Sequence, residues 1–243
     1  MRKILSYTRR AVDDYNMINE GDKIAVGVSG GKDSMALMLA MKALQRFYPK
    51  KFELCAVSLS LGFQEMDYTP LEKLCTENEI ELVIEKTQIA DIIFNVRKEK
   101  NPCSLCANMR RGALHDAAKK LGCNKVALGH HFDDVIETFF LCLLNEGRVN
   151  CFSPVTYLDR KQIYMIRPFI YMPEKEIKRF VRESEVPVIK NKCPADGNTS
   201  RQYMKELVAK LDYDNRGVKE RIFRAVQNSG IKGWDTDCIK EGL

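Results

Sequence analysis

Long apolar runs, low-complexity tracts and internal repeats are all missing from this sequence of 243 residues. No stretch approaches the roughly 20 apolar residues that a membrane-spanning helix needs. The N-terminal segment, MRKILSYTRR, lacks the apolar centre of a signal peptide. Because 45% of the residues are apolar and glycine and proline occur at ordinary levels, the composition also excludes global disorder. We therefore expect a folded cytoplasmic protein with no membrane segment.

Nine cysteines accompany this composition, without a secretory signal to explain them. In a reducing compartment we expect buried small side chains, metal ligands or redox thiols rather than a disulfide framework. The net charge of +6 is modest and by itself favours a polyanionic partner only weakly.

Strand-like and helix-like segments alternate along most of the chain. Apolar runs predict strands at 24–28, 54–59, 82–84, 126–128 and 164–166, and the segments between them have helical spacing. This alternation indicates an α/β fold with a doubly wound parallel five-stranded sheet, and helical extensions at both ends. We expect a single domain over residues 1–243, with a lead-in helix in 1–20, a Rossmann-like core in 21–190 and a helical tail in 191–243.

The segment Ser29-Gly30-Gly31-Lys32-Asp33-Ser34 lies directly between the first predicted strand and the helix after it. Glycines let backbone N–H groups approach a phosphate, hydroxyls donate hydrogen bonds, and a helix N-terminus favours anions. The segment is not a Walker A loop, because that motif requires glycine at Val26 and serine or threonine at Asp33. An ordinary turn with serine and aspartate caps is the alternative. The combined residue types favour a phosphate-binding loop.

A second polar cluster, Gly129-His130-His131-Phe132-Asp133-Asp134, begins where the fourth strand is expected to end. Its imidazoles and carboxylates can bind a metal, act as acid and base, or organise Mg²⁺ bound to ATP. A core histidine followed by an aspartate-capped helix is the alternative. In a parallel sheet ligands bind beyond the carboxyl ends of the strands, so this cluster, the loop 29–34 and Arg167 are expected to meet in one cleft.

Cys103 and Cys106 form a Cys-x-x-Cys pair ahead of a predicted helix, and Cys193 follows far along the chain. Two thiols at this spacing can share a metal or form a redox pair. A closed zinc site would need a fourth ligand, and the sequence has no second Cys-x-x-Cys or histidine pair. Cys55, Cys75 and Cys142 lie in apolar periodic stretches and are expected in the core.

Several of these motifs resemble a known family. The segment VSGGKDS at 28–34 resembles the PP-loop of the ATP pyrophosphatases, which split ATP between the α- and β-phosphates. The longer segment NPCSLCANMRRGAL at 101–114 resembles the tRNA 2-thiocytidine synthetase (TtcA) family. The same family is matched, over roughly residues 5–230, by the segments 14–18, 20–22, 128–138 and 167–171.

This resemblance implies a fold of the adenine nucleotide alpha-hydrolase type and assigns roles to particular residues. Ser29, Gly30, Gly31, Asp33 and Ser34 would hold pyrophosphate and Mg²⁺, and Lys32 occupies a variable position of the loop. Ser58, Gly129 and His130 would also contact the nucleotide. The expected catalytic residues are Asp33, Asp133, Asp134 and Arg111, although the choice between Asp133 and Asp134, and between Arg110 and Arg111, stays open.

The resemblance also implies a 4Fe–4S cluster on Cys103, Cys106 and Cys193. Many members have a second Cys-x-x-Cys around the third cysteine, whereas here Lys190 stands at its first position. The implied activity is ATP-dependent adenylation of a tRNA base followed by thiolation, with 2-thiolation of cytidine in the anticodon loop as the family's reaction. A cysteine desulfurase would supply sulfur, and many relatives form dimers.

Basic residues recur near the cysteine pair, near Cys193 and in the tail, and such a patch would suit RNA phosphates. A target base must leave its stack to reach an adenylating centre. The alternatives are a PP-loop ligase of the lysidine synthetase type, a uridine thiolase, or a nucleotide-binding module without turnover.

Overall fold

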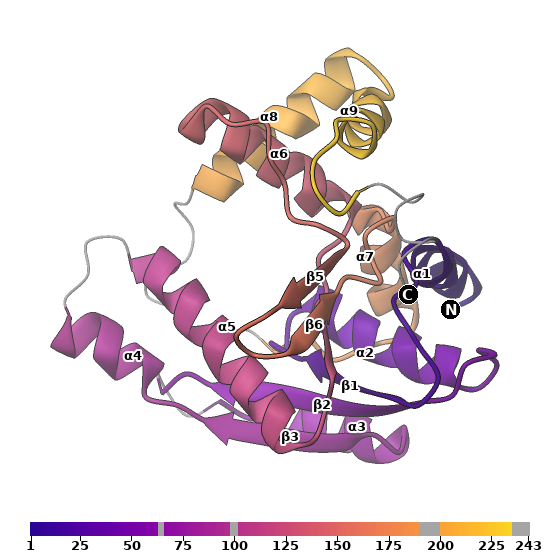
Figure 1. Cartoon of the computed structure of the whole chain (residues 1–243), viewed down its shortest axis with the longest axis vertical. Coiled ribbons are helices and arrows are strands. Elements are labelled where there is room, and N and C mark those ends of the chain that lie inside the picture. Colours follow the sequence, from indigo (N-terminus) through magenta and orange to yellow (C-terminus); the bar gives the residue numbers. More distant parts are fainter. Residues whose placement is uncertain (63–65, 98–101, 190–199, 235–243) are drawn as a thin grey trace.

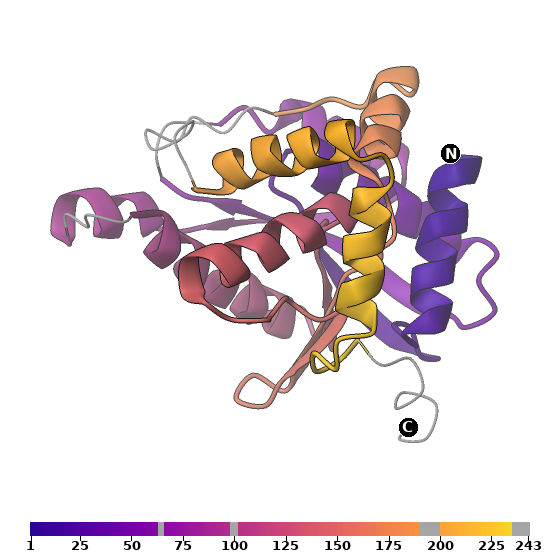
Figure 2. The same cartoon turned by 90° about the horizontal axis from the view of Figure 1, so that it is seen from above.

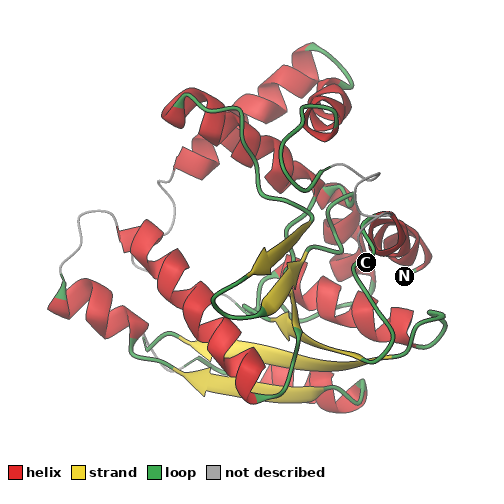
Figure 3. Cartoon of the chain, in the orientation of Figure 1, coloured by secondary structure: helices red, strands yellow, loops and turns green. Residues whose placement is uncertain are grey.

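A computed structural model of the chain describes residues 1–62, 66–97, 102–189 and 200–234. Within these residues six strands form one sheet in the order β3-β2-β1-β4-β6-β5 (Figures 1 and 3). The strands are β1 (Asp22–Gly27), β2 (Phe52–Ser60), β3 (Glu81–Lys86), β4 (Lys125–Ala127), β5 (Val155–Leu158) and β6 (Ile163–Ile166). All neighbouring strands are parallel except β5, which runs antiparallel to β6.

Helices follow most of the strands. They are α1 (Arg2–Asp14), α2 (Lys32–Gln45), α3 (Thr69–Glu77), α4 (Ile89–Asp91), a π-helical turn (Ile92–Val96), α5 (Pro102–Lys120), α6 (Phe132–Glu146), α7 (Glu174–Glu183), α8 (Ser200–Asp214) and α9 (Val218–Gln227). The predicted doubly wound α/β fold is thereby confirmed.

Alternate residues of the central strands enter different apolar clusters on the two faces of the sheet. Ile24 and Val26 of β1 pack into the larger cluster, with α1, α2 and α7. Ala25, between them, packs into a second cluster with Leu114 and Ala118 of α5. This alternation follows from the two-residue period of a strand, and burial on both faces explains the nearly continuous apolar run of β1.

Helices α6, α8 and α9 pack against one another. Figures 1 and 2 show them side by side, at the end of the molecule remote from β3. The segment predicted to form a helical tail therefore contributes α8 and α9. The start of α8 lies close to the second turn of α6, where Arg201 hydrogen-bonds Thr138.

Three expectations about secondary structure were wrong. The sheet has six strands rather than five, because Val155–Leu158 forms an edge strand that is only four residues long and half-exposed. The lead-in helix spans Arg2–Asp14 rather than residues 1–20, since Asn16 adopts a left-handed backbone with φ 43°. Helix α5 also begins at Pro102 and therefore contains the cysteine pair, which was expected to precede the helix.

Among the cysteines, Cys55, Cys75, Cys123 and Cys151 are buried, whereas Cys142, expected in the core, is only half-buried. The Sγ atoms of Cys55 and Cys123 lie 3.5 Å apart. No helix in the described part of the chain combines the length and the apolar character needed to cross a bilayer.

Candidate active site

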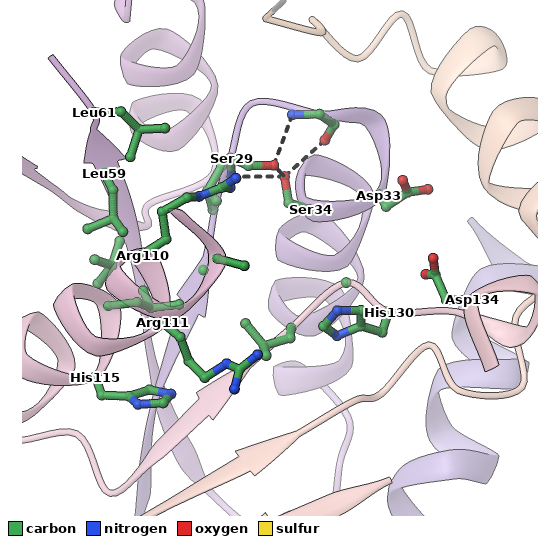
Figure 4. Close-up of a pocket in the computed structure, with 18 of the residues that line it drawn as sticks. Ser29, Asp33, Ser34, Leu59, Leu61, Arg110, Arg111, His115, His130 and Asp134 are labelled. Atoms are coloured by element: carbon green, nitrogen blue, oxygen red, sulfur yellow. Dashed lines mark hydrogen bonds between the residues drawn. The ribbon is translucent and has the colours of Figure 1, made fainter. Parts of the chain in front are cut away.

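A cavity of about 430 Å³ opens at the carboxyl ends of β1, β2 and β4. This volume falls in the range of roughly 300–1,000 Å³ typical of small-molecule sites. Its walls come from the β1–α2 loop, the end of β2, helix α5, the β4–α6 loop and the first turn of α8 (Figure 4). The position matches the expectation that the two polar motifs meet beyond the carboxyl ends of the parallel strands.

The β1–α2 loop is held in shape by its own hydroxyl groups. The Ser29 N–H donates to Ser34 Oγ at 3.1 Å, and Ser34 Oγ donates to the Gly31 carbonyl at 2.9 Å (Figure 4). Gly31 is the N-cap of α2 and makes no side-chain cap hydrogen bond. The helix therefore presents backbone N–H groups and the positive end of its dipole at the cavity, which is the requirement for an anion site.

Gly30 has a structural reason to be glycine. Its φ is +82°, and a Cβ atom there would lie 2.8 Å from Cβ of Ile189. The Ile189 N–H also donates to the Gly30 carbonyl at 2.9 Å. The loop thus lies directly against the segment that follows α7, and only glycine fits both the backbone conformation and the space.

Gly129 brings the second motif against the first. A Cβ atom at this position would meet the backbone carbon of Asp33 at 3.1 Å and the backbone nitrogen of Ser34 at 3.2 Å. The β4–α6 loop therefore packs on the first turn of α2, and the absence of a side chain at Gly129 allows this approach.

Lys32 points away from the cavity. Its Nζ lies 2.9 Å from Oδ2 of Asp33 and 3.0 Å from Oε1 of Glu174. Burial by itself lowers the pKa of Lys32, but these two carboxylates outweigh burial and the pKa is raised. Lys32 is absent from the cavity lining, so its expected contact with the cofactor stays a prediction that this geometry does not favour.

His131 connects two carboxylates of the cavity. Its Nδ1 accepts a hydrogen bond from the Asp134 N–H at 3.4 Å, so the proton of the neutral imidazole belongs on Nε2. That Nε2 lies 3.7 Å from Asp33 Oδ1 and 3.5 Å from Asp134 Oδ2. Asp33 and Asp134 both line the cavity, and carboxylate oxygens held near one another suit Mg²⁺.

Asp133 faces the opposite way from Asp134. Its carboxylate accepts the Glu174 N–H at 2.7 Å, at the start of α7, and Lys219 Nζ from α9 at 2.9 Å. Burial raises the pKa of Asp133, but these two donors outweigh burial and the pKa is lowered. The cavity lining includes Asp134 and not Asp133. The arrangement favours Asp134 as the catalytic carboxylate, and a catalytic role for Asp133 stays a prediction.

Arg110 and Arg111 both reach the cavity from α5. Figure 4 shows Arg110 directed toward the loop with Ser29 and Ser34, whereas Arg111 and His115 lie on the other side of the cavity. Two guanidinium groups can therefore act on different parts of one ligand.

His130 also lines the cavity, with its ring centroid 5.0 Å from that of Phe152. Burial and the nearby Arg167 lower the pKa of His130 to about 4, so the imidazole is neutral at physiological pH. Arg167 was expected in the cleft but does not line it. It is buried behind Phe152 and donates to the Ser153 carbonyl and to Thr156 Oγ1.

Ser58 lies outside the lining as well. It is 1% exposed, while its neighbours Val57 and Leu59 line the cavity. Successive residues of a strand point to opposite faces, so Ser58 faces away from α5. A contact between Ser58 and the nucleotide stays a prediction that this arrangement does not favour.

The cysteine pair lies in the first turn of α5, where Cys103 is exposed and Cys106 is half-buried. Ala107, one turn after Cys103, lines the cavity, and Arg110 and Arg111 follow on the same side of the helix. The third predicted ligand, Cys193, lies outside the described residues. Within the described ranges no group of three histidine, cysteine or acidic side chains is placed to hold one metal ion.

Two polar lining residues were not identified as site residues from the sequence. His115 follows Arg111 by one helical turn, a spacing that would have indicated a shared face. The other is Arg201, which was not distinguished from the basic residues near Cys193 that were expected to suit RNA phosphates. Its Nη1 lies 3.8 Å from Asp134 Oδ1, and its Nη2 donates to Thr138 Oγ1 at 3.1 Å.

The chain is similar to several known proteins. The family model described as PP-loop domain matches residues 4–211. A protein of Geobacter sulfurreducens named tRNA-cytidine(32) 2-sulfurtransferase is 39% identical, over 93% of this chain and 90% of that protein. A protein of the same name from Alcanivorax borkumensis is 38% identical, over 93% of this chain and 81% of that protein.

Among solved structures, the U34-tRNA thiolase NcsA from Methanococcus maripaludis, described with its [4Fe-4S] cluster, has a TM-score of 0.75. The similarity covers 98% of this chain and 79% of NcsA, at 22% identity. This likeness supports the fold.

Proposed function

The chain belongs to the PP-loop domain family, as its motifs indicate, and we propose that it is an ATP-dependent tRNA thiolase that forms AMP and pyrophosphate. The proposed target is the 2-position of cytidine 32, which the names of the similar bacterial proteins specify. Such an enzyme would work in the cytoplasm, where tRNA is modified.

The observation that carries this proposal is the convergence of the phosphate loop, two carboxylates and two arginines on one cavity. The loop 29–34 suits the β- and γ-phosphates that leave as pyrophosphate. Asp33 and Asp134 suit Mg²⁺ bridging the phosphates. Val57, Leu59 and Leu61 form an apolar wall at the end of β2 that suits the adenine ring.

In the proposed first step, the oxygen at the 2-position of the base attacks the α-phosphorus of ATP. A bond forms between this oxygen and phosphorus, and the bond to the bridging oxygen of the β-phosphate breaks, so pyrophosphate leaves. Arg111 lies where it can offset negative charge that develops on the α-phosphate.

In the second step, a sulfide attacks the carbon that carries the adenylated oxygen, and AMP leaves with that oxygen. Activation is needed because an amide-like oxygen is a poor leaving group, whereas a phosphate ester is a good one. The residues proposed to hold the sulfur-carrying group are Cys103, Cys106 and Cys193. A 4Fe–4S cluster bound by three cysteines would keep one iron open to hydrosulfide.

The described residues fit this role in two respects. Cys103 and Cys106 lie within one helical turn of each other on α5, and Cys103 is exposed next to the cavity-lining Ala107. Ile189, the last described residue before the segment with Cys193, hydrogen-bonds the phosphate loop at Gly30. A cysteine desulfurase is the proposed sulfur donor, and a homodimer is the proposed assembly.

The central test combines tRNA and ATP with protein purified without oxygen. We expect pyrophosphate release that depends on tRNA, and we expect the purified protein to contain iron and labile sulfide. In a separate experiment, mass spectrometry of tRNA from a deletion strain should show the loss of one thionucleoside. Asp33→Ala should abolish pyrophosphate release, and unchanged release would contradict the assignment of the loop.

The same measurements separate the alternatives. A ligase of the lysidine synthetase type would release pyrophosphate but would leave every thionucleoside intact in the deletion strain. A uridine thiolase would leave the 2-thiocytidine unchanged and remove a thiouridine instead. A nucleotide-binding module would bind ATP and release no pyrophosphate.

A further inference from the structure

Unpartnered polar atoms gather around the cavity. Asp33 Oδ1, His115 Nε2 and His130 Nδ1 are buried and have no hydrogen-bond partner among the described residues, and all three side chains line the cavity. Buried polar atoms in native proteins nearly always have a hydrogen-bond partner, so each atom without one needs an explanation, such as a catalytic role or a bound water, ion or ligand. Bound Mg²⁺ would account for Asp33 but not for the two imidazoles.

The first of the two histidines, His115, lies on α5, is 3% exposed, and follows Arg111 by one turn. Burial and the charge of Arg111 lower the pKa of His115, so its imidazole is neutral. The apolar side chains of Leu114 and Leu128 also line the cavity beside it.

The histidine side of the cavity differs in chemistry from the loop side. The loop side offers backbone N–H groups, hydroxyls and Arg110, which suit phosphates (Figure 4). The other side offers two neutral imidazoles and Arg111 beside the apolar side chains of Leu114 and Leu128, and the His130 ring lies 5.0 Å from that of Phe152. Neutral imidazoles both donate and accept hydrogen bonds, which suits the polar edge of an uncharged heterocycle better than an anion.

We propose that His115 and His130 form the subsite that receives the target pyrimidine, with His115 as a residue that determines which base is accepted. This inference rests on the proposed function. Figure 4 shows Arg111 between the two histidines, so its guanidinium would lie beside a base bound there and could offset charge where the oxygen of the base meets the α-phosphate. The edge of the base, with its carbonyl, ring nitrogen and exocyclic amine, would supply the partners that the two imidazoles lack.

The test compares His115→Leu, His115→Gln and the control Asp116→Ala, an exposed neighbour on the same helix that does not line the cavity. Two quantities are measured: the Kd for ATP by calorimetry, and kcat/KM for tRNA in pyrophosphate release. A third is the ratio of kcat/KM for tRNA carrying cytidine to that for tRNA carrying uridine at the target position.

We expect His115→Leu to lower kcat/KM for tRNA by about 10-fold or more, as when a binding site loses a hydrogen bond to its substrate. The cytidine-to-uridine ratio should fall, while the Kd for ATP stays within about twofold of wild type, a change too small to represent a lost contact. His115→Gln, which keeps a polar atom, should restore part of the loss, and Asp116→Ala should match the wild type.

Two results would overturn the subsite. One is an equal loss of ATP affinity, which would make His115 part of the nucleotide site. The other is a His115→Leu variant whose kcat/KM and cytidine-to-uridine ratio equal those of a wild-type protein that does thiolate tRNA. A wild type that releases no pyrophosphate with tRNA would overturn the proposed function itself, and the base subsite with it.

Discussion

Lys219 of α9 places its Nζ 2.9 Å from Oδ1 of Asp133, at the start of α6. The other oxygen of the same carboxylate accepts the backbone N–H of Glu174, the first residue of α7. One aspartate of the Gly-His-His-Phe-Asp-Asp motif therefore joins three helices, while its neighbour Asp134 faces the cavity. The two carboxylates are adjacent in sequence, but Asp133 holds the helices together and Asp134 faces the cavity.

This division predicts opposite results for two conservative substitutions. Asp133→Asn should lower the free energy of unfolding by about 1–3 kcal/mol, because Lys219 loses its charged partner in a mostly buried site. Asp134→Asn keeps an oxygen to accept the His131 N–H, so it should change stability less. It should lower kcat for pyrophosphate release about 100-fold, the scale of a lost electrostatic contact in a transition state.

Urea unfolding and pyrophosphate release under saturating ATP and tRNA measure the two effects separately. Equal loss of kcat in both variants, with equal stability, would mean that Asp133 also acts in catalysis.

Glu174 is the anchor of a second network. Its carboxylate lies 3.0 Å from Lys32 Nζ, 2.8 Å from Lys205 Nζ and 3.1 Å from Lys178 Nζ. Burial raises the pKa of Glu174, but the three lysines outweigh burial and hold the pKa well below its usual range. A depressed pKa means that this carboxylate stabilises the fold above the pKa of the unfolded chain, and that the contribution is lost as pH falls toward the folded pKa.

Glu174→Gln should accordingly destabilise the protein by about 2 kcal/mol at pH 7.5, since three ammonium groups lose a nearly buried partner. The difference from wild type should shrink as pH falls below about 4.3, the usual pKa of glutamate, because the wild-type side chain then becomes neutral in the unfolded chain. Glu183→Gln, on the exposed face of the same helix, is the control and should behave as wild type. A pH-independent loss would contradict the electrostatic explanation.

Glu137 should show the reverse dependence on pH. It is 5% exposed on α6, and burial, with the nearby Asp134, raises its pKa to about 7. A raised pKa means that the folded protein binds a proton that the unfolded chain has released, so stability falls as pH rises from about 4.3 to about 7.

Glu137→Gln removes this cost and should stabilise the protein by about 2 kcal/mol at pH 8, with little effect at pH 4.5. The free energy of unfolding in urea, measured at both pH values, tests the sign. A variant less stable than wild type at pH 8 would mean that ionised Glu137 has a partner that favours its charge, such as Arg201 or Lys205.

The sequence predicted the parts of the site that depend on local pattern. Ser29 to Ser34 follows a buried strand and opens a helix, and Gly129 to Asp134 follows another, so their convergence could be expected from the direction of parallel strands. The sixth strand was missed because Val155–Leu158 is an edge strand with only half-buried side chains.

The roles of individual side chains were harder to predict, because they depend on partners far away in the chain. Asp133 is held by Lys219, and Lys32 by Glu174, and neither pair has a sequence signature. The orientation of adjacent residues such as His130 and His131 depends on the backbone of a loop, which has no fixed period. His115 alone could have been found, from its helical spacing to Arg111.

The contact between Gly30 and Ile189 makes a final prediction about the phosphate loop. Gly30→Ala introduces both a left-handed backbone strain of roughly 1–2 kcal/mol and a Cβ atom too close to Ile189. At Gly31, where φ is −71°, a Cβ atom would meet only Ser29 Oγ at 3.5 Å, an ordinary contact, so Gly31→Ala is the matched control for stability.

A double-mutant cycle with Ile189→Gly separates the two causes, because removing the Cβ of Ile189 relieves the clash and leaves the strain. We expect Gly30→Ala to cost about 2 kcal/mol or more in the wild-type background and about 1 kcal/mol less with Ile189→Gly, as measured by urea unfolding. An equal cost in both backgrounds would show that backbone strain alone selects glycine at position 30. The contact with Ile189 would then contribute nothing to the loss of stability caused by Gly30→Ala.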